Sequence, residues 1–329
     1  MIFKVKSKKF IIILMEIVML SAKSISSDLI DTLTSKTVDG IVHSVFDHAC
    51  NIQLDKNRLV TLISPKLPNY PSTIKLDIAE NRMIRSIGFK TGMKAAVNKD
   101  EIKIPDINIT ILLTDANVWD SSPLFLPPAI PKEILYEDLE KIWKLTLKYG
   151  TMKGVASVLD KDKKYNYCVN FIIDSLKKLP TGIRCYNYKM ISEITHHLIG
   201  FGPGLTPAAD DFLLGLIASI YYIGHYFGNR FESLKKITNA MISGIAGRTT
   251  LISEIMLKNG IEARFCEPLK ELMVALIGGT FIDQKCLALL NIGGTSGSDC
   301  AAGIVWGGLL MFDIGKLTGG EENGPKISR

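Results

Sequence analysis

The segment Gly200-Phe-Gly-Pro-Gly-Leu-Thr-Pro-Ala-Ala-Asp-Asp211 runs directly into the apolar stretch Phe212–Tyr222. Its three glycines allow positive φ and let the backbone approach a ligand closely. Thr206 followed by Pro207 is typical of an N-cap and a first helical residue, and aspartates in the first turn suit the helix dipole. The pattern therefore predicts a loop that enters a helix and exposes N–H groups suited to an anion. Capping alone would explain the Thr-Pro pair but not the glycines, which favours a binding role.

A second glycine-rich stretch, Gly293-Gly-Thr-Ser-Gly-Ser-Asp299, leads into the apolar stretch Ala301–Phe312 in the same way. In both, an Asp precedes a helix glycine by four residues and shares a helix face with it: Asp211 with Gly215, and Asp299 with Gly303. Two such helix starts predict one polar pocket, where N–H groups bind an oxyanion and carboxylates bind amide N–H groups or a metal. The alternative is two independent capped junctions. Each apolar stretch has only about ten to twelve residues, which favours a buried core helix over a membrane span.

A third junction, Gly244-Ile-Ala-Gly-Arg-Thr-Thr250, places Arg248 at a helix start. An Arg is unfavourable there, so it needs a partner: a carboxylate or phosphate bound bidentately, or equally an Asp or Glu on a neighbouring helix. The histidines argue against zinc, because adjacent His196 and His197 would point about 100° apart on a helix and no further ligand lies three or four residues away. No cofactor is predicted; a divalent metal is left open, with nothing in the sequence to support it.

The hydrophobic period changes at the proline-rich segment Ser121–Pro131. Before it, short β-branched runs between turns predict strands at Ile41–Phe46, Asn51–Leu54, Leu59–Ile63, Thr73–Ile78, Ile102–Ile104 and Ile107–Leu113. After it, apolar spacing of three to four predicts a helix from Lys132 to Gly150 and others at 164–178, 191–199, 207–227, 231–246, 249–259, 267–277, 283–291 and 299–314. These elements predict an α+β fold, with a small antiparallel β barrel or sandwich domain followed by an all-α helical domain. The predicted parts are an amino-terminal extension (1–22), the β-rich domain (23–130), the helical domain (131–316) and a disordered tail (317–329).

Composition excludes several classes of protein. The 329 residues are 47% hydrophobic and 22% charged, which excludes a disordered chain or a fibre. Four lysines and one glutamate within residues 1–20 carry half of the net charge of +6, so no basic face for nucleic acid is expected. The same segment resembles a secretory signal, but a first strand or helix, or a later start at Met15 or Met19, is favoured. The six scattered cysteines contain no C-x-x-C pair, which predicts buried free thiols and a cytoplasmic location.

With these elements placed, the chain resembles the AllH-like family, a subunit of oxamate carbamoyltransferase found with enzymes of allantoin degradation. The resemblance rests on Gly202-Pro-Gly-Leu-Thr-Pro-x-x-Asp-Asp-Phe-Leu-Leu-Gly215, supported by Thr249-Thr-x-x-Ser253 and Gly294-Thr-Ser-Gly-Ser-Asp-x-x-x-Gly303. Weaker matches are His43-Ser-Val-Phe46, Asn51 and Trp119-Asp120, and together they span about residues 25–315. The chain departs from the family at Ala208-Ala209, where Ser-Gly is commoner, and at Gly294, where His is frequent.

The resemblance implies carbamoyl transfer between oxalurate plus phosphate and oxamate plus carbamoyl phosphate, in anaerobic purine catabolism and with two other subunits as partners. Because both substrates are anions, we expect phosphate or carboxylate binding at Gly202, Gly204, Thr206, Arg248, Thr249, Thr295, Gly297 and Ser298. Asp210, Asp211 and Asp299 are the expected catalytic residues, which orient the carbamoyl or oxamate nitrogen. Two rival hypotheses are a non-catalytic scaffold subunit and an exported protein of unknown function. No nucleic acid or membrane partner is expected.

Overall fold

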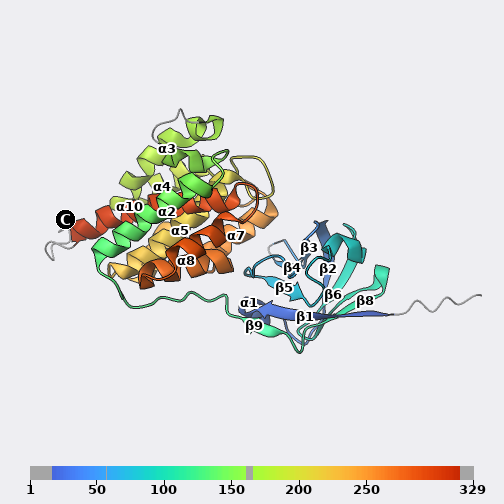
Figure 1. The fold of residues 1–329 in the computed structure, drawn as a ribbon. Helices are drawn as coiled ribbons and strands as arrows, with labels where there is room; N and C mark the ends of the chain where they lie inside the picture. The colour runs from blue at the N-terminus through green and yellow to red at the C-terminus, as the bar shows by residue number, and fades with distance from the viewer. Residues whose placement is uncertain (1–16, 57, 161–165, 319–329) are drawn as a thin grey trace, which may run out of the picture. The chain divides into compact units, whose positions relative to one another are not determined.

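A computed structural model describes residues 17–56, 58–160 and 166–318. The basic stretch of the predicted extension and the predicted tail from residue 319 onward lie outside these described residues. The described residues form two compact units: one contains Ser72–Trp119 and the described residues up to Leu67, and the other contains Pro68–Pro71 and the described residues from Asp120 onward (Figure 1). The first unit is a β barrel and the second is helical, which confirms the predicted α+β fold class.

In the described part of the first unit, nine strands form one sheet in the order β5-β4-β3-β2-β6-β7-β8-β1-β9. Pairing of β5 with β1 closes eight of these strands into a barrel. The pairs β4–β5, β1–β8 and β1–β9 are parallel, so the barrel is mixed rather than purely antiparallel. The strands are β1 (Val18–Ser26), β2 (Val38–Val45), β3 (Ala49–Gln53), β4 (Leu59–Ile63), β5 (Thr73–Leu76), β6 (Lys94–Val97), β7 (Glu101–Ile104), β8 (Ile109–Leu112) and β9 (Asn117–Trp119), with a short helix α1 (Ser27–Thr32) and one-turn helices at Ile84–Ile87 and Pro105–Ile107.

Strand β1 begins inside the segment that the sequence assigned to an amino-terminal extension. Val18 to Ser21 pair in parallel with Ile109–Leu112 of β8, and Ile25 pairs with Ile74 of β5. These pairings join strands more than forty residues apart in the chain, so the local pattern of β1 could not reveal them. From residue 18 onward this segment is a strand of the barrel.

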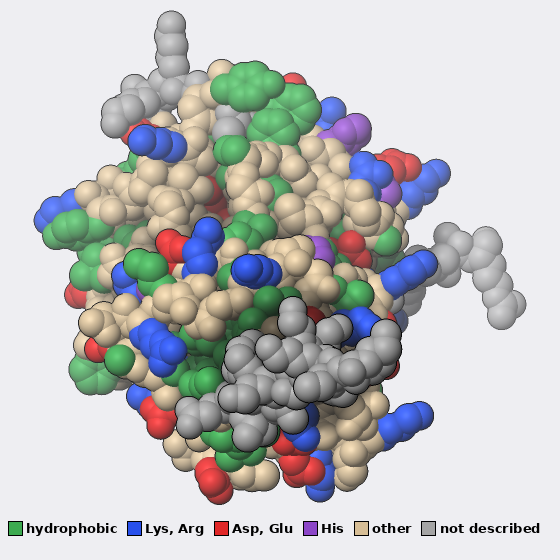
Figure 2. Space-filling view, turned by 90° about the vertical axis from the view of Figure 1, so that its right-hand side faces the viewer, with side chains coloured by type: hydrophobic (Ala, Val, Ile, Leu, Met, Phe, Trp, Pro, Cys, Tyr) green, Lys and Arg blue, Asp and Glu red, His purple; other side chains and the backbone are tan. Residues whose placement is uncertain are grey.

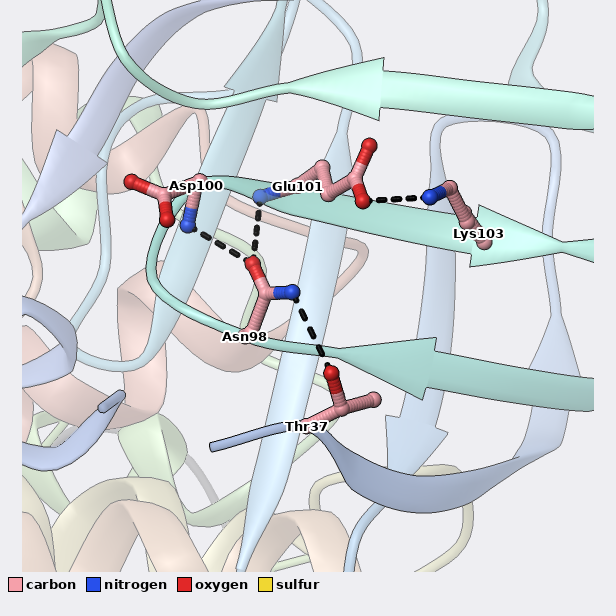
Figure 3. A network of polar contacts seen from close by, with 5 residues as sticks. All are labelled: Thr37, Asn98, Asp100, Glu101 and Lys103. Atoms are coloured by element: carbon pink, nitrogen blue, oxygen red, sulfur yellow. Dashed lines mark hydrogen bonds and ion pairs between the residues drawn. The ribbon is translucent and has the colours of Figure 1, made fainter. Parts of the chain in front are cut away.

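A polar network fixes the hairpin between β6 and β7 (Figure 3). The Asn98 side-chain oxygen accepts hydrogen bonds from the backbone N–H groups of Asp100 (2.8 Å) and Glu101 (2.9 Å). Its amide nitrogen donates to the hydroxyl of Thr37 at 3.3 Å, and Lys103 pairs with Glu101. An Asn that bonds its own following backbone is a common way to set a tight turn. Sequence reasoning missed β6, whose four residues are too few to show a clear alternation.

In the second unit, the other helices pack around two long apolar helices, α5 (Ala208–Tyr226) and α10 (Ser296–Thr318). Every residue of α5 from Ala208 to Gly224 is buried, which confirms the prediction of a core helix. Within the described residues, none of the helices has the length and apolar character needed to cross a membrane. The other helices are α2 (Lys132–Tyr149), α3 (Tyr167–Arg184), α4 (Tyr188–His196), α6 (Phe231–Met241), α7 (Leu251–Ile261), α8 (Glu267–Gly278) and α9 (Ile282–Leu290), with a one-turn helix η3 (Val155–Leu159).

Two helix boundaries differ from the predicted ones because a capping residue or a turn determines where the helix starts or ends. Helix α6 ends at Met241 instead of residue 246, because Gly244 and Gly247 adopt positive φ (70° and 71°) in the turns that follow. Helix α4 starts at Tyr188, three residues earlier than predicted, because the Asn187 side chain accepts from the N–H of Met190 and caps it.

The cysteine prediction holds for four of the five described thiols. Cys50, Cys266, Cys286 and Cys300 are free and buried, whereas Cys185 is free and exposed. Cys185 follows the last residue of α3, where the chain turns toward α4, so no core packs over it. The expectation that the thiols are buried is therefore wrong for Cys185.

Charged side chains of both signs are interspersed on the face drawn in Figure 2. The described chain contains exposed ion pairs, such as Lys141 with Asp283 and Lys235 with Glu262, each at 2.7 Å. Exposed pairs of this kind contribute about 0–1 kcal/mol each, so the stability of the chain rests on its two cores.

Candidate functional site

Helices α5 and α10 pack against each other through reciprocal glycines. A Cβ on Gly215 would overlap the carbonyl oxygen of Cys300, and a Cβ on Gly303 would overlap that of Phe212. One turn further along, the Ser219 hydroxyl donates to the carbonyl of Ile304 at 2.8 Å. Positions near the start of one helix thus meet positions near the start of the other. The two helices therefore run parallel, with their N-termini at the same end.

Three glycine-rich junctions meet at this end. The hydroxyls of Thr206, before α5, and Ser296, at the start of α10, lie 3.0 Å apart. Thr250, which caps α7, donates from its side chain to the carbonyl of Leu205 at 2.6 Å, and its neighbour Thr249 donates to Asp210. The starts of α5, α7 and α10 therefore form one polar cluster, which we call the triple junction.

Asp210 is a fully bonded member of the triple junction. Its carboxylate accepts from the N–H of Gly200 (2.8 Å), from the Ser253 hydroxyl (2.6 Å) and from the Thr249 hydroxyl. Burial raises the pKa of Asp210 above its usual value, and the hydroxyls of Ser253 and Thr249 partly offset that rise. These contacts tie the loop before α5 to the start of α7, so Asp210 holds the junctions together.

Replacing Asp210 with Ala is expected to destabilise the chain by about 2–4 kcal/mol, because it leaves the half-buried N–H of Gly200 and the buried hydroxyl of Ser253 without their acceptor. Urea unfolding of the Asp210→Ala variant measures this loss. The matched control is Asp313→Ala on α10, which removes only the exposed pair with Arg184 and should cost less than about 1 kcal/mol. Equal losses in the two variants would contradict a structural role for Asp210.

The start of α5 differs from the prediction in its cap. The helix begins at Ala208 with Pro207 in the cap position, and no side chain caps it. Thr206 bonds Ser296 instead, so its prediction as the N-cap is wrong. The N–H of Ala209 donates to the carbonyl of Phe201 at 3.0 Å, and that of Asp210 to the carbonyl of Pro207 at 2.9 Å. These two N–H groups therefore already have acceptors, and the anion site expected there does not include them.

Asp211 is buried like Asp210 but has different hydrogen-bond partners. It is 5% exposed, and its Oδ2 atom has no hydrogen-bond partner. Burial raises the pKa of Asp211 to about 8, and the nearby Asp299 and Asp210 add to the rise, while hydrogen bonds from Ser296 and Thr206 oppose it. At neutral pH its carboxyl group is therefore mostly protonated and able to donate a hydrogen bond.

Asp299 is the second buried carboxyl group, on the first turn of α10. It is fully buried, its Oδ1 atom accepts from the N–H of Ala156 at 2.7 Å, and its Oδ2 atom has no partner. Burial raises the pKa of Asp299 to about 7, against hydrogen bonds from Ala156, Thr295 and Val155. The contact with Ala156 requires Gly154, since a Cβ there would overlap the Asp299 carboxylate. Sequence reasoning missed this one-turn helix, η3, although Gly154 was a signal of close approach.

Other predicted site residues have structural partners. The Arg248 guanidinium donates to the carbonyl of His196 at 3.0 Å, at the end of α4, so its partner is a helix C-terminus and not a carboxylate. The N–H of Gly297 donates to the carbonyl of Ile292 at 3.0 Å, and a Cβ on Gly297 would overlap the carbonyl of Leu289. The Ser298 hydroxyl accepts from the N–H of Thr151 at 2.8 Å. Gly202 and Gly204 have positive φ of 118° and 104°, as a glycine-rich loop requires.

Two family models match the chain. One, described as oxamate carbamoyltransferase subunit AllH, covers residues 198–308, and the other, described as AllH family N-terminal domain, covers residues 21–118. The chain belongs to the AllH family. Neither the curated proteins nor the solved structures contain a match. The AllH match contains all three glycine-rich junctions, and the family description implies a subunit of a multi-subunit carbamoyltransferase.

One residue near Asp211 comes from a segment of the chain far from the triple junction in sequence. Tyr70, in the segment Pro68–Pro71, packs against the helical core and is close enough to Asp211, Cys266 and Cys300 to interact with them electrostatically. Its neighbour Asn69 donates two hydrogen bonds to the Glu267 carboxylate, both at 3.0 Å. In the sequence, the segment is marked only by the prolines at its two ends. Among the described residues, no group of three or more His, Cys, Asp or Glu is arranged to hold a metal ion.

Proposed function

We propose that this AllH chain contributes carboxyl groups to a carbamoyl-transfer site that interconverts oxalurate plus phosphate and oxamate plus carbamoyl phosphate. The observation that carries the proposal is the pair Asp211 and Asp299, buried at the shared N-terminal end of α5 and α10, each with one oxygen that has no hydrogen-bond partner. A buried polar atom without a partner costs about 1–3 kcal/mol. A substrate carbamoyl or amide group would supply the missing partners.

The rest of the triple junction suits anionic substrates. The N-termini of α5 and α10 point the positive ends of two helix dipoles to one place, where phosphate and carboxylate are favoured. We assign phosphate or carboxylate binding to the loop Gly202–Gly204 and the hydroxyl of Thr206, whereas the hydroxyls of Thr249 and Thr295 are engaged by Asp210 and Asp299. Asp210 joins Asp211 and Asp299 in the proposed site as a positioning residue, because its oxygens are occupied by protein donors.

The proposal includes two further carbamoyltransferase subunits and a cytoplasmic location. The family description supports the subunit role, since it names a subunit and not a complete enzyme. Free buried thiols, such as Cys50 and Cys286, are compatible with a reducing compartment. Anaerobic purine catabolism is the proposed setting, because oxalurate is the carbamoyl donor that the proposed reaction uses.

A scaffold role is the second candidate function. It is favoured by the glycines at the α5–α10 contact and by the bonded state of Asp210, Arg248 and Gly297, all of which have structural partners. The scaffold hypothesis leaves the unpartnered oxygens of Asp211 and Asp299 without an explanation. Calorimetry of the chain with carbamoyl phosphate and with oxamate separates the two, since a scaffold alone should bind neither.

The reaction is tested by co-expressing the chain with its partner subunits and measuring phosphate-dependent cleavage of oxalurate. We expect carbamoyl phosphate to form, and the Asp299→Asn variant to lower its rate by about 10²–10⁴-fold because a site carboxyl is lost. The control Asp313→Asn lies on the same helix, about 21 Å further along, and should keep the wild-type rate. A folded complex that makes no carbamoyl phosphate would overturn the proposed reaction.

A further inference from the structure

Asp211 and Asp299 differ from the other carboxyl groups of the described chain in what surrounds them. Both lie on the first turns of parallel helices held in contact by Gly215 and Gly303, so the two groups are neighbours at one end of the helix pair. Each keeps one oxygen without a partner. Two carboxyl groups buried this close cannot both be charged without a large penalty, so the pair favours a state with one proton.

The groups that face this pair are neutral or acidic. Asp211 is acted on by Asp210, Asp299 and the thiols of Cys266 and Cys300, and by the phenol of Tyr70. From α7, Glu254 is paired with Lys258 at 2.6 Å, and before η3, Lys153 is exposed. Among these neighbours, the cations are therefore paired or turned to solvent, and neither stabilises a second negative charge on the pair.

The two carboxyl groups are held in different ways. Two backbone N–H groups of η3 and the Thr295 hydroxyl bond Asp299, and the N–H groups favour its charged form because they can only donate. The bonds to Asp211 come from hydroxyls, those of Thr206 and Ser296. A hydroxyl can both donate and accept, so it can stabilise a protonated carboxyl as well as a carboxylate. The single proton therefore resides mainly on Asp211, and Asp299 is the carboxylate.

We propose that Asp211 and Asp299 form a proton-relay pair, which takes a proton from the attacking phosphate and gives one to the departing oxamate nitrogen. This inference rests on the proposed function and specifies how that site works. It assigns opposite tasks to the two carboxyl groups: Asp299 is the base and Asp211 is the acid.

The chemistry balances with one proton moved. An oxygen of hydrogen phosphate forms a bond to the carbamoyl carbon of oxalurate, and the bond from that carbon to the oxamate nitrogen breaks with its electron pair on nitrogen. Asp299 accepts the phosphate proton and Asp211 donates its own proton to the nitrogen, which completes the amide of oxamate. The pair still holds one proton, and its transfer from Asp299 back to Asp211 resets the site. The reverse reaction uses the same steps in the opposite order.

The first test measures the proton directly on the full chain, without any substrate. Infrared spectra of protein labelled with ¹³C-aspartate should show a protonated buried carboxyl group at pH 7, which the Asp211→Asn variant loses and the Asp313→Asn control keeps. Asn is neutral and matches the protonated Asp in size, so we expect the Asp211→Asn variant to fold. A wild-type spectrum with no protonated carboxyl at pH 7 overturns the relay, even if the assembled enzyme is active.

The second test is the pH dependence of oxalurate turnover by the assembled complex. Wild type should give a bell-shaped profile, from which Asp299→Asn removes the acidic limb and Asp211→Asn the basic limb, each with a rate lower by about 10²–10⁴-fold. Limbs that stay in place in both variants overturn the relay, since a merely structural role lowers the rate without moving them. A complex that makes no carbamoyl phosphate, although the chain shows the protonated carboxyl, overturns the proposed function and the relay with it.

Discussion

Gly303→Ala should destabilise the helical unit by at least about 3 kcal/mol, although alanine stabilises an ordinary helix interior by about 1 kcal/mol relative to glycine. The sign reverses because a Cβ at position 303 would overlap the carbonyl of Phe212 and the N–H of Leu216 on the neighbouring helix. Neither group can move without breaking the hydrogen bonds of α5. The two helices would separate, and the buried face of α5 would lose its packing. Urea unfolding monitored by circular dichroism measures the change in the free energy of unfolding.

The matched control for Gly303→Ala is Gly294→Ala, nine residues earlier in the same junction. A Cβ at position 294 meets no atom within 4 Å, so that variant should stay within about 0.5 kcal/mol of wild type. Gly215→Ala should resemble Gly303→Ala, and the double variant should cost less than the sum, because the first substitution already separates the helices. A stable Gly303→Ala variant would contradict the parallel contact of α5 and α10.

Local sequence predicted the helical unit well because its main signals are local. The apolar stripe from Lys132 to Gly150 corresponds to α2, which spans Lys132–Tyr149, since both the period and the terminal glycine lie within one segment. The barrel is different. Its closure depends on β1 pairing with β5 and with β8, and neither partner is a sequence neighbour. The pattern could show short strands, but not which edges join.

Two adjacent residues of the site also show what local sequence cannot predict. Asp210 and Asp211 look alike in the sequence, and both were expected to act on substrate. On a helix they point about 100° apart, so Asp210 meets donors from Gly200 and Ser253 while Asp211 points toward α10. The spacing of Asp211 to Gly215 indicated the correct face for one of them. The donors that satisfy Asp210 come from Gly200, ten residues away, and from Thr249 and Ser253, 39 and 43 residues away, and nothing in the local pattern indicated them.

The same buried carboxyl groups make the free energy of unfolding depend on pH. The pKa of Asp211 is raised to about 8 by burial, above the ordinary value for Asp, so the native state keeps a proton that the unfolded state has already lost. The free energy of unfolding therefore contains a contribution that is fully present below about pH 4 and is lost as the pH rises to about 8. Across that window one such proton lowers the stability by about 1.4 kcal/mol per pH unit. Asp299 acts in the same direction up to about pH 7.

Asp211→Asn should remove one proton from this dependence. Asn stays neutral at every pH, so the free energy of unfolding of the variant, relative to wild type, should rise by about 3 kcal/mol between pH 5 and pH 7.5. Urea unfolding at several pH values gives the difference in slope, and Asp313→Asn, an exposed position on α10, should leave the slope unchanged. Parallel curves for Asp211→Asn and wild type would mean that Asp211 is charged in the native state. In that case the two helix dipoles at the shared start of α5 and α10 would stabilise the Asp211 carboxylate by more than burial destabilises it. The carboxylate would then bind a cationic group, instead of donating a hydrogen bond to an acceptor.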